Sequence, residues 1–139
     1  MREIVYIGCF FSREEVMEKA ARCRKDRLYR SIENPHVTFA YRPDTIPYEA
    51  FGTPVAVTVV SYGCDGENES FGVIIGELPE VLQPLAQAIE VPHITISVSK
   101  TGKPVNSRYV TCEPIEPFVL RGVFGGMGAD RKVYTKKER

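Results

Sequence analysis

Two copies of one short pattern constrain the fold of this chain more than any other feature of its sequence. The only two histidines both lie in it, as Pro35-His36-Val37-Thr38 and Pro92-His93-Ile94-Thr95, and an apolar residue follows each copy. Proline is tolerated at the first residue of a β-strand. Because alternate side chains of a strand share a face, the histidine and threonine of each copy would lie on one face. The pattern predicts two strands, each with an imidazole beside a hydroxyl.

The first copy ends a unit with the order strand, helix, strand. Residues Ile4–Phe10 form an apolar, β-rich run. Ser12, with Glu15 three residues later, is a capping-box signature. Apolar residues at helical spacing then predict a helix from about Arg13 to Arg27. Its basic last turn is typical of a solvated helix end, and the strand His36–Tyr41 follows.

The second copy ends a unit with the same order. Residues Phe71–Gly76 predict a strand, and leucines at helical spacing predict a helix that Pro84 shortens or kinks. The strand His93–Ser99 then alternates regularly. We expect one polar face made of His93, Thr95, Ser97 and Ser99.

The repeated order predicts two pseudo-symmetric lobes within the single domain 1–139, each contributing one histidine-threonine face to a shared groove. A Val-rich strand, Pro54–Tyr62, leads through a turn at Gly63–Ser70 into the second unit. A closing hairpin from Pro117 onward, with a turn within Gly122–Gly128, completes the prediction.

Composition excludes several classes of protein. The 18 basic and 18 acidic residues cancel, which argues against a protein that coats long duplex nucleic acid but leaves room for a local phosphate site. No apolar run approaches the roughly 20 residues of a membrane-spanning helix, so we expect no membrane. The four cysteines are dispersed without a C-x-x-C pair, which favours reduced thiols in a cytoplasm.

Paired histidines suit phosphodiester chemistry. Histidine has an unperturbed pKa of about 6.5, so one imidazole can take a proton from a nucleophile while the other protonates the leaving oxygen. Threonine hydroxyls can donate to the nonbridging phosphate oxygens. This arrangement requires neither a metal nor another cofactor. Zinc would need three or four ligands, and no cysteine or carboxylate lies at a recognisable ligand spacing.

Arg42 is a secondary candidate. It has the parity of His36 and Thr38, so it could reach a phosphate if the strand stays regular. By the same count Tyr41 lies on the opposite face, where packing is its expected role.

The pattern His-x-Thr followed by an apolar residue, present twice, resembles the 2H phosphoesterase superfamily, which includes RNA 2′,3′-cyclic phosphodiesterases and enzymes that trim RNA ends. The resemblance implies an α+β fold in which two antiparallel sheets with flanking helices, related by a pseudo-twofold axis, enclose a central active-site groove. It also implies metal-independent cleavage of a 2′,3′-cyclic phosphate or a 2′,5′ phosphodiester in a nucleotide or RNA end. It implies that His36 and His93 are the acid/base pair and that Thr38 and Thr95 hold the phosphate. The short distance between the two copies implies trimmed substrate-contacting loops.

Several alternatives stay open at this level. A catalytically silent nucleotide or RNA-end binding module would share the same fold, and a structural two-lobed scaffold is a third hypothesis. The sequence does not choose among RNA ends, mononucleotides, 2′,5′-oligoadenylate and cyclic ADP-ribose derivatives. It also does not say which histidine is the base, or how many copies of the chain associate.

Overall fold

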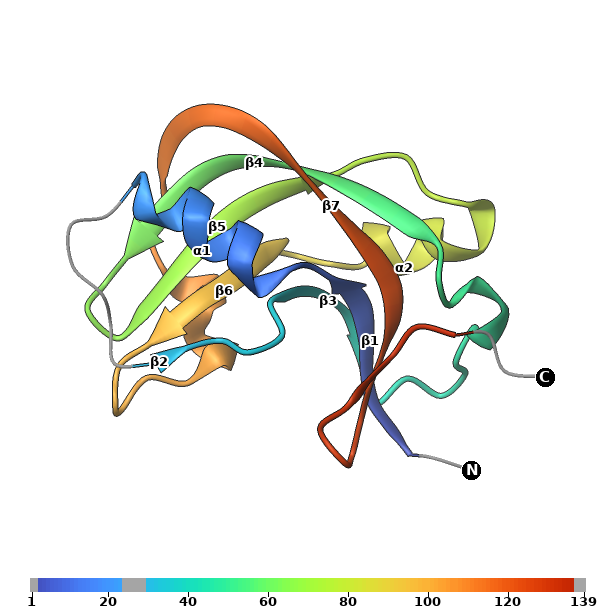
Figure 1. Ribbon diagram of the computed structural model, residues 1–139. Helices are drawn as coiled ribbons and strands as arrows, with labels where there is room; N and C mark the ends of the chain where they lie inside the picture. The colour runs from blue at the N-terminus through green and yellow to red at the C-terminus, as the bar shows by residue number, and fades with distance from the viewer. Residues whose placement is uncertain (1–2, 24–29, 137–139) are drawn as a thin grey trace.

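The computed structural model describes residues 3–23 and 30–136, which form an α+β fold, as predicted (Figure 1). The strands are β1 (Ile4–Phe10), β2 (Arg30–Ser31), β3 (His36–Tyr41), β4 (Pro54–Cys64), β5 (Asn68–Ile75), β6 (His93–Val98), β7 (Glu113–Gly128) and β8 (Val133–Tyr134). The α-helices are α1 (Arg13–Ala21) and α2 (Gln83–Gln87), and the 3-10 helices are η1 (Tyr48–Ala50), η2 (Glu80–Leu82) and η3 (Pro104–Tyr109).

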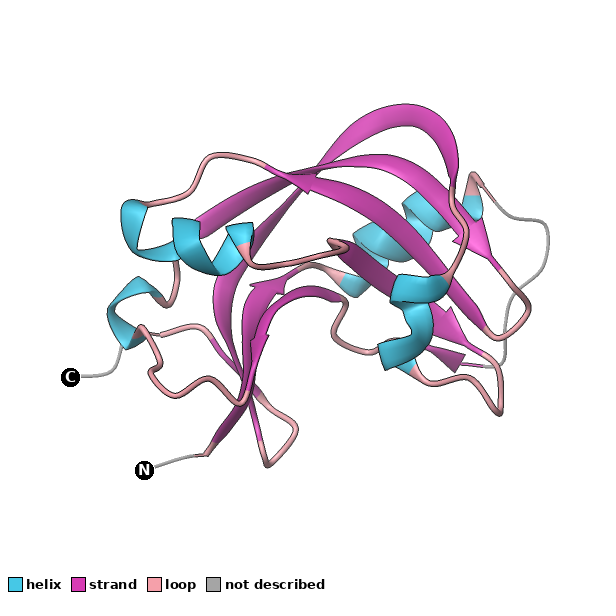
Figure 2. Cartoon of the chain, turned by 180° about the vertical axis from the view of Figure 1, so that it is seen from behind, coloured by secondary structure: helices cyan, strands magenta, loops and turns pink. Residues whose placement is uncertain are grey.

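Hydrogen bonds join these strands into one antiparallel sheet with the order β2-β6-β5-β4-β7-β1-β3, and β8 pairs with β7. The long strands β4 and β7 pair at its centre and run together over the top of Figure 1. Because these two strands connect both halves, the prediction of two separate sheets is not confirmed. Figure 2 shows the same arch from behind. The sheet curls enough that β3 and β6, from opposite halves of it, approach each other without a ladder between them.

The first strand of the chain and the two strands that carry the histidines match their predicted positions closely. The predicted strands Ile4–Phe10 and His36–Tyr41 have these bounds in the structure, and β6 ends at Val98, one residue earlier than predicted. Val37 and Phe39 of β3, and Ile94 and Ile96 of β6, are buried in the apolar core.

The turn between β4 and β5 is shorter than the predicted Gly63–Ser70. Strand β5 already begins at Asn68, because the Asp65 carboxylate accepts hydrogen bonds from the backbone N–H groups of Glu67 (2.9 Å) and Asn68 (2.7 Å). Gly66, at φ +88°, supplies the left-handed residue that the turn requires. The Asp65 side chain thus closes the turn, and more residues can pair between β4 and β5.

Strand β7 is longer than predicted. Residues Gly122–Gly128, where a turn was expected, belong to the strand instead. The glycines serve close packing. A Cβ at position 125 would lie 2.3 Å from the backbone oxygen of Tyr134, so only glycine lets β8 approach β7 at this point. The reversal occurs after Gly128 instead, before β8 begins at Val133.

Helix α1 begins as the capping-box signature predicted. The Ser12 hydroxyl accepts a hydrogen bond from the backbone N–H of Glu15 at 3.3 Å, and Val16 and Ala20 are buried. The helix ends at Ala21, whereas the prediction extended it to Arg27. Most of that extension, and most of the basic run expected in it, lies outside the described residues.

Helix α2 is short, as Pro84 predicted. The chain forms the 3-10 helix η2 first, and α2 begins only at Gln83. Leu82, the last residue of η2, is fully buried. No helix in the described part of the chain is long and apolar enough to cross a membrane.

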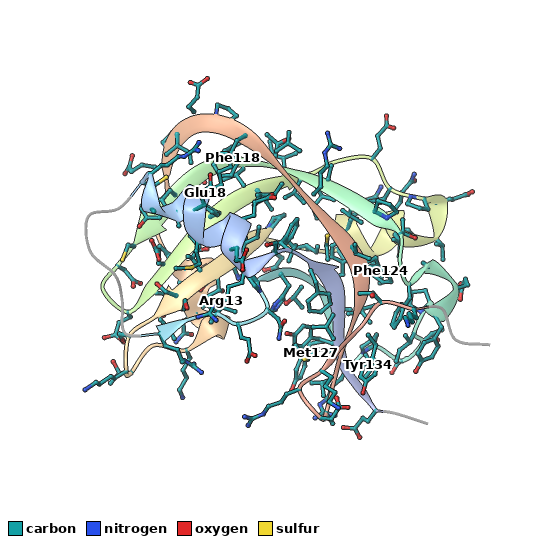
Figure 3. The ribbon with its side chains drawn as sticks, viewed as in Figure 1. Arg13, Glu18, Phe118, Phe124, Met127 and Tyr134 are labelled. Atoms are coloured by element: carbon teal, nitrogen blue, oxygen red, sulfur yellow. The ribbon has the colours of Figure 1, made fainter. Side chains whose placement is uncertain are left out.

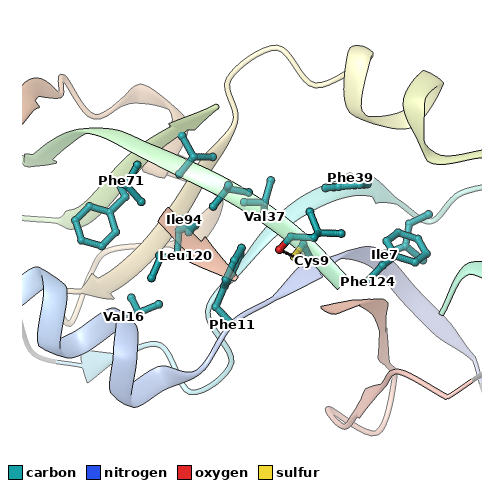
Figure 4. Packing of buried hydrophobic residues seen from close by; sticks show 14 of the residues in the cluster. Ile7, Cys9, Phe11, Val16, Val37, Phe39, Phe71, Ile94, Leu120 and Phe124 are labelled. Atoms are coloured by element: carbon teal, nitrogen blue, oxygen red, sulfur yellow. Dashed lines mark hydrogen bonds between the residues drawn. The ribbon is translucent and has the colours of Figure 1, made fainter. Parts of the chain in front are cut away.

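A single apolar cluster lies between the curled sheet and the two helices (Figure 4). Its largest fully buried apolar side chains come from both halves of the chain: Ile7, Val16, Val37, Phe51, Val55, Phe71, Leu82, Ile94, Ile96, Leu120 and Phe124. Val37 and Ile94, the residues between histidine and threonine in the two patterns, both belong to this cluster. The core therefore fixes which face of β3 and β6 the histidines occupy.

Candidate active site

Each histidine is the first residue of its strand, and the same ladder bond anchors the proline before it. The carbonyl of Pro35 accepts from the backbone N–H of Phe11 at 2.9 Å, and the carbonyl of Pro92 accepts from that of Val73 at 3.2 Å. In both cases the donor directly follows the residue that faces the histidine across the ladder. Proline has no N–H to donate, but its carbonyl still extends the ladder by one bond.

Both imidazoles make the same hydrogen bond. Nδ1 of His36 lies 2.8 Å from the carbonyl oxygen of Asn34, and Nδ1 of His93 lies 2.8 Å from that of Val91. Because a carbonyl oxygen only accepts, Nδ1 must carry the proton in each ring. Nε2 is then the basic nitrogen of the neutral form in both histidines. The two copies of the pattern thus present equivalent nitrogens.

A β-bulge occurs at the same position in both patterns. Gly8 pairs with Thr38 and Ile7 with Ala40, so Phe39 is the extra residue in β3. On β6, Ser70 pairs with Thr95 and Glu69 with Ser97, so Ile96 is the extra residue. A bulge shifts the alternation of side chains by one residue. Residues beyond each bulge therefore lie on the face opposite to that predicted by simple counting.

The expected polar face of β6 changes as a result. His93 and Thr95 share a face, as predicted, but Ser97 pairs with Glu69 and donates to its carboxylate at 2.7 Å. Glu69 also accepts from Tyr62 at 2.6 Å, on the core face of the sheet. Ser97 therefore does not belong to the histidine face.

The bulge in β3 exchanges the positions of Tyr41 and Arg42. Tyr41 pairs with Tyr6, which shares its face with Phe10, and Phe10 pairs with His36. Tyr41 therefore lies on the face of His36, contrary to the prediction. Arg42 has φ +46°, and its guanidinium lies 3.8 Å from the Glu3 carboxylate. The regular strand on which its predicted phosphate contact depended is absent.

Aromatic rings surround His36. The ring centre of Tyr6 lies 4.7 Å from that of the imidazole in a stacked arrangement, and the ring of Phe10 lies 5.5 Å away. Burial lowers the pKa of His36, the Asn34 carbonyl raises it, and the positive charge of His93 lowers it further. The influence of His93 is consistent with the approach of β3 and β6.

The two threonines differ in their surroundings. Thr38 is exposed, and no described residue forms a hydrogen bond with its hydroxyl. Thr95 is only 7% exposed, and its hydroxyl donates to Ser107 Oγ at 2.7 Å. Ser107, in η3, also accepts from Asn68 Nδ2 at 2.9 Å. The sequence did not predict this buried polar chain, because neither Ser107 nor Asn68 has a spacing that links it to the histidine pattern.

A separate cavity of about 900 Å³ lies near the end of α1, where the Lys19 ammonium is 5.5 Å from the ring centre of Phe118. Figure 3 labels Phe118 close to Glu18 of α1. Tyr62 lines it and packs against Phe71 on the face of the sheet that carries Ile94. This cavity is therefore on the opposite face from His93. Among residues 3–23 and 30–136, no group of three or more His, Cys, Asp or Glu is arranged to hold a metal ion.

Neither a protein-family model nor a curated protein sequence matches this chain.

Proposed function

We propose that this protein is a metal-independent phosphoesterase of the 2H type, which hydrolyses a 2′,3′-cyclic phosphate or a 2′,5′ phosphodiester of a nucleotide or RNA end. The observation that carries the proposal is the equivalent state of the two imidazoles. Each Nδ1 is bonded to a backbone carbonyl two residues earlier, so each ring offers its Nε2. A pair of equivalent nitrogens on two strands that approach each other across the curled sheet suits one proton acceptor and one proton donor.

The order of strands supports the bilobal, pseudo-twofold arrangement that the resemblance implies. Read outward from the centre, β7, β1 and β3 form one half, and β4, β5 and β6 form the other. The two strands with histidines occupy corresponding places, and their bulges fall at corresponding residues, Phe39 and Ile96. A substrate phosphate between the two halves would meet both patterns, within one domain that spans residues 1–139.

We assign the general base to His36 and the general acid to His93. The pKa of His36 is lowered mainly by burial, so its neutral form is favoured at neutral pH. Neutral His36 takes a proton from water, whose oxygen bonds to phosphorus. Protonated His93 gives its proton to the ribose oxygen as the bond from that oxygen to phosphorus breaks. One water is consumed, and a phosphomonoester is the product.

The threonines have a different task from the histidines. Their hydroxyls donate to the nonbridging oxygens of the phosphate, where negative charge increases in the transition state. The single proton of Thr95 Oγ1 is donated to Ser107 in the free protein, so with phosphate bound the Ser107 hydroxyl donates to Thr95 Oγ1 instead. Thr38 is available for this bond because its hydroxyl is exposed. We propose a cytoplasmic location, which the four free cysteines support because thiols remain reduced there.

The test measures hydrolysis of a panel of 2′,3′-cyclic nucleotides, cyclic-phosphate RNA oligomers and 2′,5′-oligoadenylate. We expect turnover that persists in EDTA and decreases by at least ~100-fold in both His36→Gln and His93→Gln. Glutamine keeps a polar side chain at each strand start, and thermal unfolding of each variant checks its fold. Binding of nucleotides without turnover of any substrate would instead identify a silent binding module. Full activity in both variants would exclude the proposed mechanism.

A further inference from the structure

The two halves of the proposed site differ in one respect that symmetry does not explain. Tyr41 is 66% exposed. Its counterpart in the second pattern, counted from the histidine, is Val98, which is fully buried. Tyr6 and Phe10 pack around His36. Among the described residues, aromatic rings therefore pack on His36 and none stacks on His93.

The bulge at Phe39 gives Tyr41 its position. Without the extra residue, Tyr41 would point toward the core face; with it, Tyr41 lies directly across from Tyr6. Tyr6 in turn contacts the imidazole of His36. Four ladder positions separate the pairs Tyr41–Tyr6 and His36–Phe10, which is about 13 Å along the strand. A tyrosine side chain and a nucleoside together can bridge this distance.

Tyr41 has a cation on one side. The Arg42 guanidinium lies 5.5 Å from the centre of the Tyr41 ring and is held by Glu3 at 3.8 Å. A guanidinium near the ring face supports the ring through a cation–π interaction. No described aromatic ring stacks on, or packs edge-on against, the Tyr41 ring. The ring is therefore both supported and accessible.

We propose that Tyr41 is a stacking platform for the base of a nucleoside whose phosphate lies between His36 and His93. The proposal rests on the proposed function and adds a direction to it: the base lies beside the first pattern, on β3. Bases stack on aromatic side chains with little regard to sequence, because every base has a π face. The ligand class is therefore a nucleotide with any base, and purines, with the larger face, bind more tightly than pyrimidines.

The kinetic experiment compares adenosine 2′,3′-cyclic phosphate with methyl riboside 2′,3′-cyclic phosphate, which lacks a base. The quantity of interest is the ratio of kcat/KM for the two substrates, because it cancels effects common to both. We expect this ratio to decrease at least ~5-fold in Tyr41→Ala and to be kept within about twofold in Tyr41→Phe, which retains the ring. Val119→Ala, an exposed apolar position on β7, is the matched control. An unchanged ratio in Tyr41→Ala, or an equal loss in Tyr41→Phe, would overturn the proposal.

A binding experiment separates this proposal from the proposed function. The ring resonances of Tyr41 are followed by NMR during titration with AMP and, separately, with inorganic phosphate. We expect AMP to shift these resonances upfield, as stacking requires, and inorganic phosphate to leave them in place. If the protein hydrolyses neither cyclic phosphate but AMP shifts Tyr41, the enzyme assignment fails and the base platform stands. If the protein hydrolyses both but AMP leaves Tyr41 unshifted, the platform fails alone.

Discussion

The phenol ring of Tyr6 stacks on the imidazole of His36, with ring centres 4.7 Å apart and planes inclined by 27°. The Tyr6 hydroxyl lies 3.4 Å from His36 Nδ1, farther than the Asn34 carbonyl at 2.8 Å, so the backbone bond determines the tautomer. Tyr6 therefore affects His36 through its ring, by excluding water from one imidazole face. Burial also raises the pKa of Tyr6 to about 12, so the phenol stays neutral and adds no charge.

Replacing Tyr6 by alanine should raise the pKa of His36 toward its ordinary value. Burial is the largest cause of the lowered pKa, and the substitution exposes one face of the ring to water. In the wild type, the lowered pKa of His36 favours its neutral form. If neutral His36 is the base, activity decreases on the acid side as His36 gains a proton. The acid limb of the pH profile should therefore move to higher pH in Tyr6→Ala.

The measurement is an NMR titration of His36 Cε1–H combined with kcat/KM against pH. Tyr6→Phe is the control, because it keeps the ring and removes only the distant hydroxyl. We expect its titration to resemble the wild type. If the His36 pKa were equal in Tyr6→Ala and the wild type, the ring would not be the source of the shift.

The hydroxyl of Thr38 should matter more than the charge of Arg42. Thr38 shares its face with His36, whereas the bulge at Phe39 directs Arg42 toward Glu3. Loss of one hydrogen-bond donor to transition-state charge costs about 100- to 1,000-fold in kcat in enzymes that use such donors. We expect Thr38→Val to lose at least ~10-fold in kcat/KM for the base-free cyclic phosphate and Thr38→Ser to recover most of it. Arg42→Ala should lose less than about threefold with the same substrate.

Comparing Thr38→Val with Arg42→Ala distinguishes a β3 with the bulge at Phe39 from a regular β3. A regular strand would place Arg42 beside the phosphate, and Arg42→Ala would then impair catalysis as strongly as Thr38→Val. Such a result would contradict the register in which Tyr6 faces Tyr41.

The alternation of side chains was predictable only as far as the bulges. Pro35 and Pro92 marked the strand starts, and the next two positions alternate regularly, so the shared faces of His36 with Thr38 and of His93 with Thr95 followed from the sequence. A bulge depends on the register with the neighbouring strand, which no local pattern encodes. The faces of Ser97 and Tyr41 were therefore predicted wrongly.

Contacts between segments far apart in the chain were not predictable from the sequence, for a related reason. The pairing of β4 with β7, which unites the sheet, joins segments far apart in the chain. Ser107 reaches Thr95 from a 3-10 helix that has no hydrophobic periodicity to mark it. In both cases tertiary contacts, rather than local propensity, decide the structure.

Ser107 should act on catalysis by positioning Thr95. Its oxygen accepts hydrogen bonds from Thr95 Oγ1 and Asn68 Nδ2, and the side chain is only 2% exposed. Ser107→Ala would leave both donors without this acceptor, at a cost of about 1–3 kcal/mol in the free energy of unfolding. When Thr95 donates to the phosphate, the Ser107 hydroxyl donates to Thr95 Oγ1, so Ser107→Ala removes a contact that orients Thr95 toward the phosphate. We expect kcat to decrease about tenfold with a smaller change in KM.

Ser97→Ala is the matched control for Ser107→Ala. Ser97 is also 2% exposed and donates one hydrogen bond, to Glu69, but it lies beyond the bulge at Ile96 on the core face. We expect a comparable loss of stability in urea unfolding with kcat within about twofold of the wild type. Since both variants remove a buried hydroxyl, a merely structural role for Ser107 would give them equal kcat values. A kcat that decreases only in Ser107→Ala would assign the positioning of Thr95 to this serine.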